Sequence, residues 1–204
     1  SSDVCSSDLQ KGISVIPWGE KEYPGRLKEI YDPPYALYVK GKLPDDTARA
    51  AAIVGARSCT PYGEKYALEY GKKLAECGIQ VISGLARGVD GIGQRGALLG
   101  GGKTFAVLGS GVDVCYPKNH MGLYLDILEQ EGGILSELPP GTPPLPQHFP
   151  RRNRIISALS DIVLVMEARE RSGSLITADL ALEQGKDVYA LPGPVNSSLS
   201  QGCN

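Results

Sequence analysis

The chain has 204 residues, an apolar fraction of 42% and a formal net charge of -2. This length favours one main domain with a sizeable core, and the balance of charge excludes a uniformly basic surface. A site for nucleic acid must therefore be a local cluster of cations.

Cysteine and histidine usage argues against a metal centre. Five cysteines are scattered without a C-x-x-C pair, and the chain has only two histidines, so we expect neither a metal nor a cofactor. Scattered thiols suit a reducing compartment. No apolar run approaches the roughly 20 residues of a membrane span, and no signal peptide is visible. We expect a cytoplasmic protein without a membrane span.

The N-terminal part divides into two segments. Residues 1–10, SSDVCSSDLQ, show no pattern of core residues, and we interpret them as a disordered tail or a non-native segment. Residues 11–46 are expected to form an extension packed on the main domain. There the pair Pro33-Pro34 blocks a helix, and the following YALYVKG predicts a short strand.

Residues 47–204 alternate short apolar runs with helical patterns. Strands are predicted in RAAAIVG, IQVISG, KTFAVLGSG, GILSELPPG, DIVLVMEA and KDVYALPG. Helices are predicted in GEKYALEYGKKLAECG, DGIGQRGALLG, MGLYLDILEQEGG, RIISALS and SLITADLALEQG. This alternation predicts an α/β, Rossmann-like domain with a mostly parallel sheet and helices on both faces.

Arginines gather in the segments that follow these strands. Ligands of such sheets bind beyond the carboxyl ends of the strands, and free amides at the next helix starts favour anions such as phosphate. A single loop arginine is usually only solvated. The gathering of several arginines in these loops is what predicts a ligand site at this edge of the sheet. These arginines are Arg57, Arg87, Arg151, Arg152, Arg154, Arg169 and Arg171.

The stretch HFPRRNR combines cations with an aromatic ring at the start of a predicted helix. Arg151 and Arg154 are expected to hold phosphates, and Asn153 to donate to a phosphate or a base edge. Phe149 either stacks on a base or anchors its loop in the core. Arg57 would reach the same edge from the first loop. Cations for phosphates and a flat ring for bases are the groups that a single strand of nucleic acid requires, and binding through them would be largely independent of sequence.

Polar residues at the same edge have alternative roles. Acids in these loops could be catalytic, but they more often cap helices or pair with arginines; they are Asp90, Asp113, Glu137 and Glu167. Ser172 and Ser174 are N-cap candidates first and phosphate ligands second. The sequence shows no Ser-His-Asp, Cys-His or Walker-type set, so we expect a protein without enzymatic activity.

The chain resembles the DNA-processing protein A family in segments that keep the family's order and spacing. Among them are AIVGARSCTPYG, VISGLARGVD, AVLGSGVDVCYPKNH, HFPRRNRIISALSDIVLVMEA and SGSLITADLALEQGKDVYALPG. The resemblance covers nearly everything from about residue 16 to the end. It implies an extended Rossmann fold, a homodimer, protection of incoming single-stranded DNA and help in loading the RecA recombinase in natural transformation. Together with the loop pattern it predicts a DNA site at Arg57, Arg87, Phe149, Arg151, Arg152, Asn153, Arg154, Ser172, Gly173 and Ser174.

Some features depart from the family. Gly93 and Gln94 stand where members often carry an Ala-His pair, which argues against a role for histidine there. The helical N-terminal domain of many members is not found, and the chain stops at Asn204, before the helix expected next. We therefore expect an incomplete C-terminus.

An enzymatic alternative stays open. VMEARERSGSLITADLALEQ also resembles, loosely, the glycine-rich turn of lysine decarboxylase-like phosphoribohydrolases, which cleave nucleoside monophosphates. In that alternative Ser172, Gly173 and Ser174 would bind the nucleotide, and Glu183 would assist glycosidic cleavage. A third possibility is a passive scaffold in which the arginines only pair with acidic residues.

Overall fold

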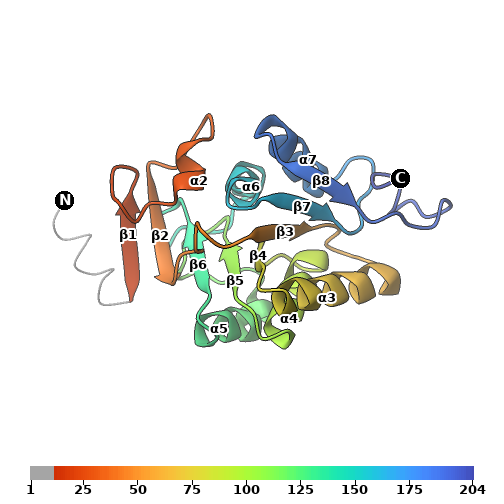
Figure 1. Ribbon diagram of the computed structural model, residues 1–204, viewed down its shortest axis with the longest axis horizontal. Coiled ribbons are helices and arrows are strands. Elements are labelled where there is room, and N and C mark those ends of the chain that lie inside the picture. Colours follow the sequence, from red (N-terminus) through yellow and green to blue (C-terminus); the bar gives the residue numbers. More distant parts are fainter. Residues whose placement is uncertain (1–11) are drawn as a thin grey trace.

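The computed structural model describes residues 12–204, so the expectation for residues 1–10 lies outside the described part. One eight-stranded sheet runs in the order β1-β2-β6-β5-β4-β3-β7-β8 (Figure 1). The strands β3 to β8 pair in parallel, whereas β1 and β2 add antiparallel pairs beside β6. The strands are β1 (Ile13–Pro17), β2 (Ala36–Gly41), β3 (Ala50–Val54), β4 (Gln80–Ser83), β5 (Thr104–Val107), β6 (Gly133–Ser136), β7 (Ile162–Val165) and β8 (Asp187–Ala190).

Helices cover both faces of this sheet. In Figure 1 the lower face carries α3 (Pro61–Glu76), α4 (Val89–Leu99) and α5 (Met121–Glu129). The short helix η1 (Lys118–His120) directly precedes α5. The upper face carries α2 (Gly25–Lys28), α6 (His148–Ala158) and α7 (Gly173–Glu183). The predicted α/β, Rossmann-like architecture with helices on both faces is therefore confirmed.

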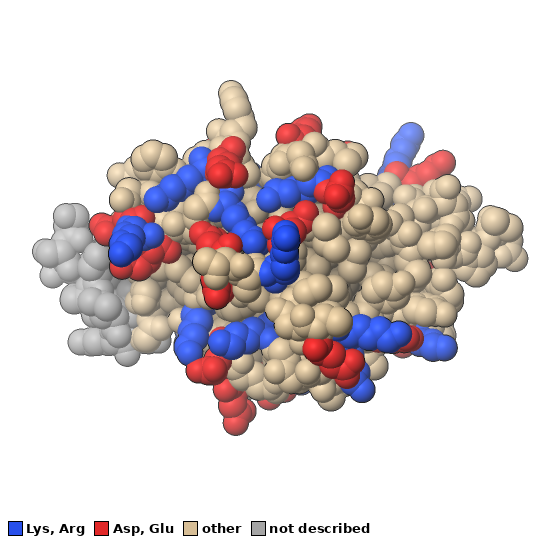
Figure 2. Space-filling model, in the orientation of Figure 1, with Lys and Arg blue, Asp and Glu red and all other residues tan. Residues whose placement is uncertain are grey.

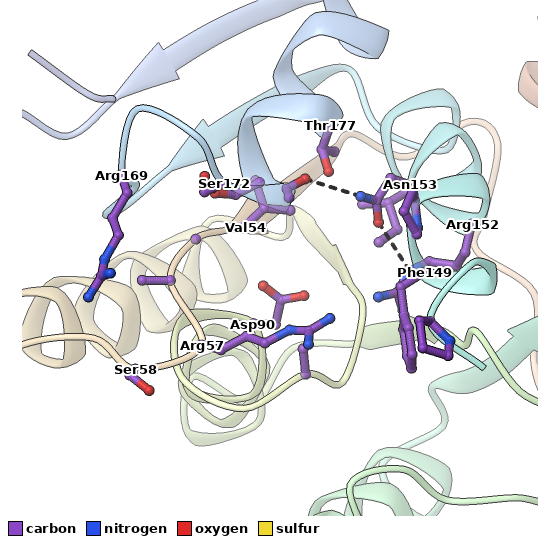
Figure 3. Close-up of a pocket in the computed structure, with 18 of the residues that line it drawn as sticks. Val54, Arg57, Ser58, Asp90, Phe149, Arg152, Asn153, Arg169, Ser172 and Thr177 are labelled. Carbon is purple, nitrogen blue, oxygen red and sulfur yellow. Dashed lines mark hydrogen bonds between the residues drawn. The ribbon is translucent and has the colours of Figure 1, made fainter. Parts of the chain in front are cut away.

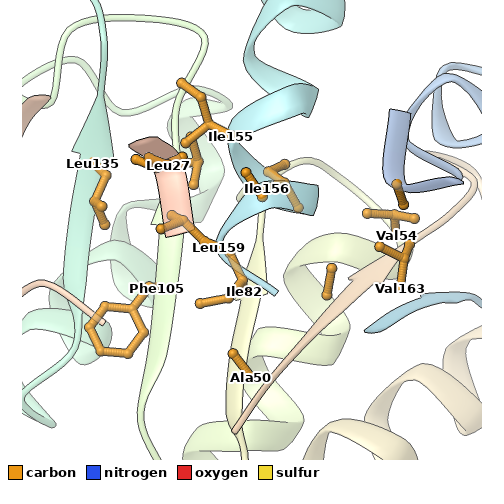
Figure 4. Close-up of a cluster of buried hydrophobic side chains, with 14 of the residues drawn as sticks. Leu27, Ala50, Val54, Ile82, Phe105, Leu135, Ile155, Ile156, Leu159 and Val163 are labelled. Atoms are coloured by element: carbon orange, nitrogen blue, oxygen red, sulfur yellow. The ribbon is translucent and has the colours of Figure 1, made fainter. Parts of the chain in front are cut away.

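The buried sheet holds α6 in place. Its side chains Ile155 and Ile156 pack with Ile82 and Val163 in the cluster between α6 and the strands (Figure 4). Complete burial of each such side chain contributes roughly 1.5–3 kcal/mol. This packing fixes α6 over the sheet and sets the position of its first turn.

Glycines let α3 and α4 pack backbone to backbone. A Cβ atom at Gly71 would lie 2.1 Å from the carbonyl oxygen of Gly93, and one at Gly96 would lie 2.2 Å from that of Leu68. Only residues without a Cβ allow so close an approach. The glycines of the predicted helix DGIGQRGALLG are therefore packing residues and do not interrupt α4.

Several elements differ from the sequence prediction, including the short helices α2 and η1, which no sequence pattern indicated. Ile13–Pro17 forms β1, an edge strand that the sequence pattern did not reveal. The helix predicted in RIISALS begins earlier, at His148. Pro150 is compatible with that start, because first-turn amides have no partner within the helix. Arg151 and its neighbours therefore lie on a helix and point in different directions.

The chain order places a crevice at one point of the sheet. β3 lies between β4 and β7, so successive strands are added on one side of β3 up to β6 and on its other side from β7 onward. Ligands of open α/β sheets bind beyond the carboxyl ends of the strands at such a reversal.

Candidate nucleic-acid interface

A pocket of about 600 Å³ opens at the carboxyl ends of β3 and β7. Three segments form its walls: the loop after β3, the first turns of α6, and the start of α7 (Figure 3). Seven of the ten predicted site residues line it: Arg57, Phe149, Arg152, Asn153, Ser172, Gly173 and Ser174. Tertiary structure thus brings together residues that lie more than 100 positions apart.

Phe149 is both an anchor and a wall of the pocket. A Cβ atom at Gly109 would lie 2.9 Å from its ring, so the ring packs closely on the loop after β5. The side chain is half-buried, and the Tyr116 ring lies 5.6 Å away between centroids. The guanidinium groups of Arg57 and Arg152 lie 5.3 and 5.8 Å from the ring centroid. These cation–π contacts keep two positive charges at the aromatic wall.

Arg152 forms the floor of the pocket. Its side chain is buried, and its Nη1 donates to the carbonyl oxygens of Gly84, at 2.9 Å, and Val107. Burial lowers the pKa of Arg152 to about 10, while nearby Asp90 opposes that shift. The group stays positive at neutral pH. The sequence-based assignment of Arg152 as a DNA contact is therefore corrected to a buried charge that ties α6 to β4 and β5.

Asp90 supplies the acidic group at this floor. Among the described lining residues of the pocket it is the sole carboxylate. Its Oδ2 accepts a hydrogen bond from the Gly84 amide at 3.2 Å. Burial raises the pKa of Asp90, and the positive charge of Arg152 opposes the shift. The two buried charges offset each other, so the exposed cations at the rim set the sign of the accessible field.

The start of α7 presents polar groups to the pocket. Asn153 Nδ2 donates to the Gly173 carbonyl at 3.2 Å, which fixes α7 against α6 (Figure 3). Ser172 and Ser174 bond each other through their hydroxyls at 2.7 Å. Ser172 occupies the N-cap position of α7, as predicted, but its side chain makes no hydrogen bond to the helix amides. First-turn amides of a helix favour an anion.

Arg154 does not contribute to this pocket. Its Nη1 and Nη2 each donate to a Glu137 carboxylate oxygen at 2.7 Å, and its Nε donates to the Asp32 carbonyl at 2.8 Å. The side chain is 9% exposed. The predicted phosphate contact of Arg154 is corrected to an internal ion pair, because its donors are used within the protein. Arg151 stays 62% exposed, with Nε 3.5 Å from Glu137.

The other acids of the edge also serve the fold. Glu167 is buried and accepts bonds from the Thr60 amide and hydroxyl, both at 2.8 Å, and Thr60 in turn caps α3. Asp113 accepts a bond from the Gly141 amide at 2.7 Å. These contacts agree with the structural alternative for the acids and leave the catalytic one without support.

A second hollow adjoins the pocket across Arg57. It measures about 490 Å³, and Arg57 and Ser58 line both spaces. Arg87, which does not line the main pocket, is exposed here beside Asn119 and His120. The two hollows therefore lie side by side and are separated by Arg57 and Ser58. Exposed arginines from the β3–α3 and β4–α4 loops line them.

Four side chains hold the β4–α4 loop that carries Arg87. Leu85 has a positive φ of 56°, which is strained for a branched side chain. The Gln94 Oε1 atom accepts from the Leu85 amide at 3.0 Å, and the His120 Nδ1 atom lies 2.8 Å from the Leu85 carbonyl. Since a carbonyl only accepts, Nδ1 carries the proton. Asp90 and Arg152 bind the amide and carbonyl of Gly84. Gln94, at one position of the family's Ala-His pair, thus has a structural role.

The enzymatic alternative lacks its carboxylate. Ser172, Gly173 and Ser174 line the main pocket, but Glu183 is exposed at the other end of α7. Glu183 comes ten positions after Gly173 along the helix, a rise of about 15 Å. Glu183 instead lines a smaller hollow of about 240 Å³ between α2 and α7. The proposed nucleotide turn and the proposed acid are therefore not brought together.

Some lining residues escaped the sequence prediction. Thr177 faces the pocket one helical turn after Gly173, a position that the i, i+4 spacing of a helix would have revealed. Arg169 lay on the predicted edge but was not chosen as a site residue, and it lines the pocket. Leu199 comes from the C-terminal loop, where no sequence signal marked it. Within residues 12–204, no cluster of His, Cys, Asp and Glu fits a metal ion, and no helix has the length and apolarity of a membrane span.

Comparison with known proteins identifies the family. The chain is 46% identical over 193 residues to protein Smf of Escherichia coli, covering 95% of this chain and 52% of that protein, so it spans about half the length of this relative. The structure of DNA processing protein A from Streptococcus pneumoniae matches with a TM-score of 0.86 and 41% identity, over 99% of this chain and 72% of that one.

A second solved structure is described by its single-stranded DNA binding mode. It is DNA processing protein A from Helicobacter pylori, with a TM-score of 0.81 and 34% identity over 93% of this chain and 84% of that one. The family model for DNA recombination-mediator protein A matches residues 14–204. The chain belongs to the DNA recombination-mediator protein A family.

Proposed function

We propose that this chain binds single-stranded DNA, largely without regard to sequence, in the pocket at the carboxyl ends of β3 and β7. The observation that carries the proposal is the meeting of three kinds of group in one pocket. Arg57 and Arg169 supply exposed cations, the first turn of α7 supplies amides, and Phe149 supplies an aromatic wall. Phosphates and bases of a single strand require these groups. The Helicobacter relative, whose structure is described by this binding mode, supports the proposal.

Seven of the ten predicted contacts have a place in this proposal. Arg57 holds a phosphate at the ridge between the two hollows, and Arg87 holds one in the second hollow. Phe149, with Tyr116, offers a surface for a base. The hydroxyls of Ser172 and Ser174 and the amide of Gly173 bind a phosphate at the start of α7. Arg151 adds an exposed cation outside the pocket.

Binding of oligo-dT at several salt concentrations tests the proposal. With three to five phosphate contacts, log K should fall with log salt at a slope of roughly −2 to −4, at about 0.7 per contact. A nucleoside monophosphate should compete only weakly. A slope near zero, or strong preference for one base sequence, would contradict this mode of binding.

We also propose that binding proceeds without catalytic turnover. The pocket lacks the carboxylate Glu183 of the enzymatic alternative, and its acid Asp90 lies on the buried floor. Incubation with nucleoside monophosphates, followed by chromatography for free base, checks this. Base release that disappears in Glu183→Gln would restore the enzymatic alternative.

Assembly and partner are further proposals. We infer a homodimer, and the edge strand β8 with exposed Leu182, Tyr189 and Val195 supports a contact surface at that end of the sheet. The family's description as a recombination mediator supports protection of incoming DNA and loading of the RecA recombinase in natural transformation. Light scattering at micromolar concentration tests the first proposal, and the rate of RecA filament formation on protected single strands tests the second.

A further inference from the structure

We propose that the bound strand continues along the carboxyl edge of the sheet and stacks on a second aromatic pair, Trp18 and Tyr35. The inference rests on the proposed function, because it extends the path of the same ligand. It adds a binding surface formed by the first two strands, outside the pocket.

The strand order places this pair on the same edge as the pocket. β2 runs antiparallel to β6, and β1 antiparallel to β2. The start of β2 and the end of β1 therefore lie at the carboxyl edge of the parallel strands, at the upper ends of these two strands in Figure 1. Tyr35 directly precedes β2 and Trp18 directly follows β1.

The register of the β1–β2 ladder places Trp18 and Tyr35 on one face of the hairpin. The Trp18 amide donates to the Tyr35 carbonyl at 2.8 Å, which extends the β1–β2 ladder by one pair. Residues opposite each other in such a ladder share a face. Alternation puts this pair on the face of Ile16 and Leu37, which belong to the cluster beneath α6. The pair therefore lies on the face from which α6 presents Phe149.

The exposure of these rings needs an explanation beyond the fold. Trp18 is 49% exposed and Tyr35 is 89% exposed. Single exposed apolar residues are ordinary, but two large aromatic side chains opposite each other at a ligand edge form a patch. Neither ring is required for the buried clusters of the described chain. Their position suits a contact with a flat apolar ligand.

Intermediate groups connect the pocket to the pair. Beyond β5, the Tyr116 ring is 45% exposed beside Phe149. Beyond β6, the exposed Arg151 lies next to Glu137. Because β5, β6, β2 and β1 are neighbours in this order, these groups and the aromatic pair follow one another along the edge.

A hydrogen-bonded contact joins α6 to the loop before β2. Arg154 Nη1 donates to the Arg151 carbonyl at 2.7 Å, and its Nε donates to the Asp32 carbonyl, three residues before Tyr35. The surface near Arg151 is thereby held against the segment that leads to Tyr35. The fold itself thus fixes the spacing between the cation and the second aromatic pair.

Single-stranded DNA is the ligand that this sequence of groups fits. Aromatic faces separated by a cation are typical of surfaces on which bases stack without sequence readout. Three strand intervals separate β5 from β1, or about 14 Å at ~4.8 Å each, so a strand longer than the pocket is needed to reach the pair. Basic and acidic side chains are interleaved on the face shown in Figure 2. We therefore assign stacking, and not added phosphate contacts, to the aromatic pair.

Trp18 reports on its own role, because it is the single tryptophan of the chain. Its fluorescence should be followed while oligo-dT of two lengths is added, about 4 and about 12 nucleotides, within the range of known single-strand sites. The short strand should occupy the pocket and leave the emission unchanged. The long strand should bind more tightly and change the emission.

A variant with a matched control separates the aromatic pair from the pocket. Tyr35→Ala should weaken binding of the long strand about fivefold or more, the loss of one base stack, and leave the short strand unaffected. The salt slope should not change. Tyr70→Ala removes another exposed tyrosine, on α3, and should bind both strands normally. Arg57→Ala should weaken both.

The outcomes distinguish the inference from the function on which it rests. Two results would overturn the inference: Trp18 emission that responds equally to both strands, or normal binding of the long strand by Tyr35→Ala. If Arg57→Ala still weakens binding of both strands, the proposed function stands and only the inference fails. If neither strand binds the unmodified protein, the proposed function and the inference both fail. Length-dependent emission together with a length-dependent defect in Tyr35→Ala supports the inference.

Discussion

The arginines of α6 and the arginines of the loops have opposite environments. Arg152 and Arg154 lie within three residues of Arg151, yet both are buried with their donors bound inside the protein. Arg57 and Arg169 stand far apart in sequence, yet both are exposed and line one pocket. A cluster of cations along the chain is therefore not the same as a cluster of available cations on the surface.

Helical geometry explains the difference. Successive residues of a helix are turned by about 100°, which directs Arg152 away from Arg151. Arg151 and Arg154, in contrast, are three residues apart, and both lie against Glu137. On α6, Arg151 points outward, while Arg152 and Arg154 reach buried partners on separate elements. The loops after parallel strands instead converge at one edge. The comparison predicts that α6 substitutions mainly affect stability and that loop substitutions mainly affect binding.

The largest effect is expected for Arg154→Ala. The variant leaves Glu137 buried without its partner, which should lower the free energy of unfolding by about 3–5 kcal/mol. Chemical denaturation measures this change. Arg151→Ala is the matched control, because it removes an exposed arginine beside the same carboxylate and should change stability by about 0.5 kcal/mol or less. Equal stability of the two variants would contradict the buried-pair assignment.

Phe149 lies on α6 and also lines the pocket, so Phe149→Ala tests a residue that the two regions share. Loss of a base stack should weaken binding of single strands by roughly 1–3 kcal/mol with nearly the same salt slope. Because the ring also packs on Gly109, the melting temperature should fall as well. Phe149→Leu keeps an apolar anchor and should restore most of the melting temperature but not the affinity. Full affinity in this variant would assign Phe149 to the anchor role alone.

Arg57→Ala tests the loop side of the comparison. Its guanidinium contacts the Phe149 ring at the ridge between the hollows. The substitution should weaken binding to all single strands and reduce the salt slope by about 0.7, as expected for one lost phosphate contact. Stability should change little, because the side chain is exposed. A normal salt slope would remove Arg57 from the phosphate contacts.

The smallest effect is expected at His120. His120→Ala removes the donor to the strained Leu85 carbonyl, a hydrogen bond whose net contribution is about 1 kcal/mol. His120→Asn keeps an amide donor and should recover part of the stability. Thermal melts of both variants measure the difference. Melts that match the unmodified protein in both would show that Gln94 and the buried Leu85 side chain hold this loop without His120.

The sequence by itself determined the architecture and the edge that carries the pocket. Alternating apolar runs such as AAAIV and amphipathic helices predict a parallel sheet, since strands covered on both faces must be apolar throughout. Residues after parallel strands must meet at one edge, so Arg57 and Ser172 could be grouped without coordinates. The strand β1 was missed because ISVIP is short and lacks strict alternation, although Gly12 and Gly19 flank it in turns.

Only the tertiary structure decided which residues are available for a ligand. The true start of α6 turns Arg152 toward the carbonyls of β4 and β5 and Arg154 toward Glu137. Local sequence does not encode these partners, because they come from distant segments that packing brings together. For the same reason Glu183 could be proposed beside Ser172 from its spacing, whereas the rise of α7 carries it out of the pocket.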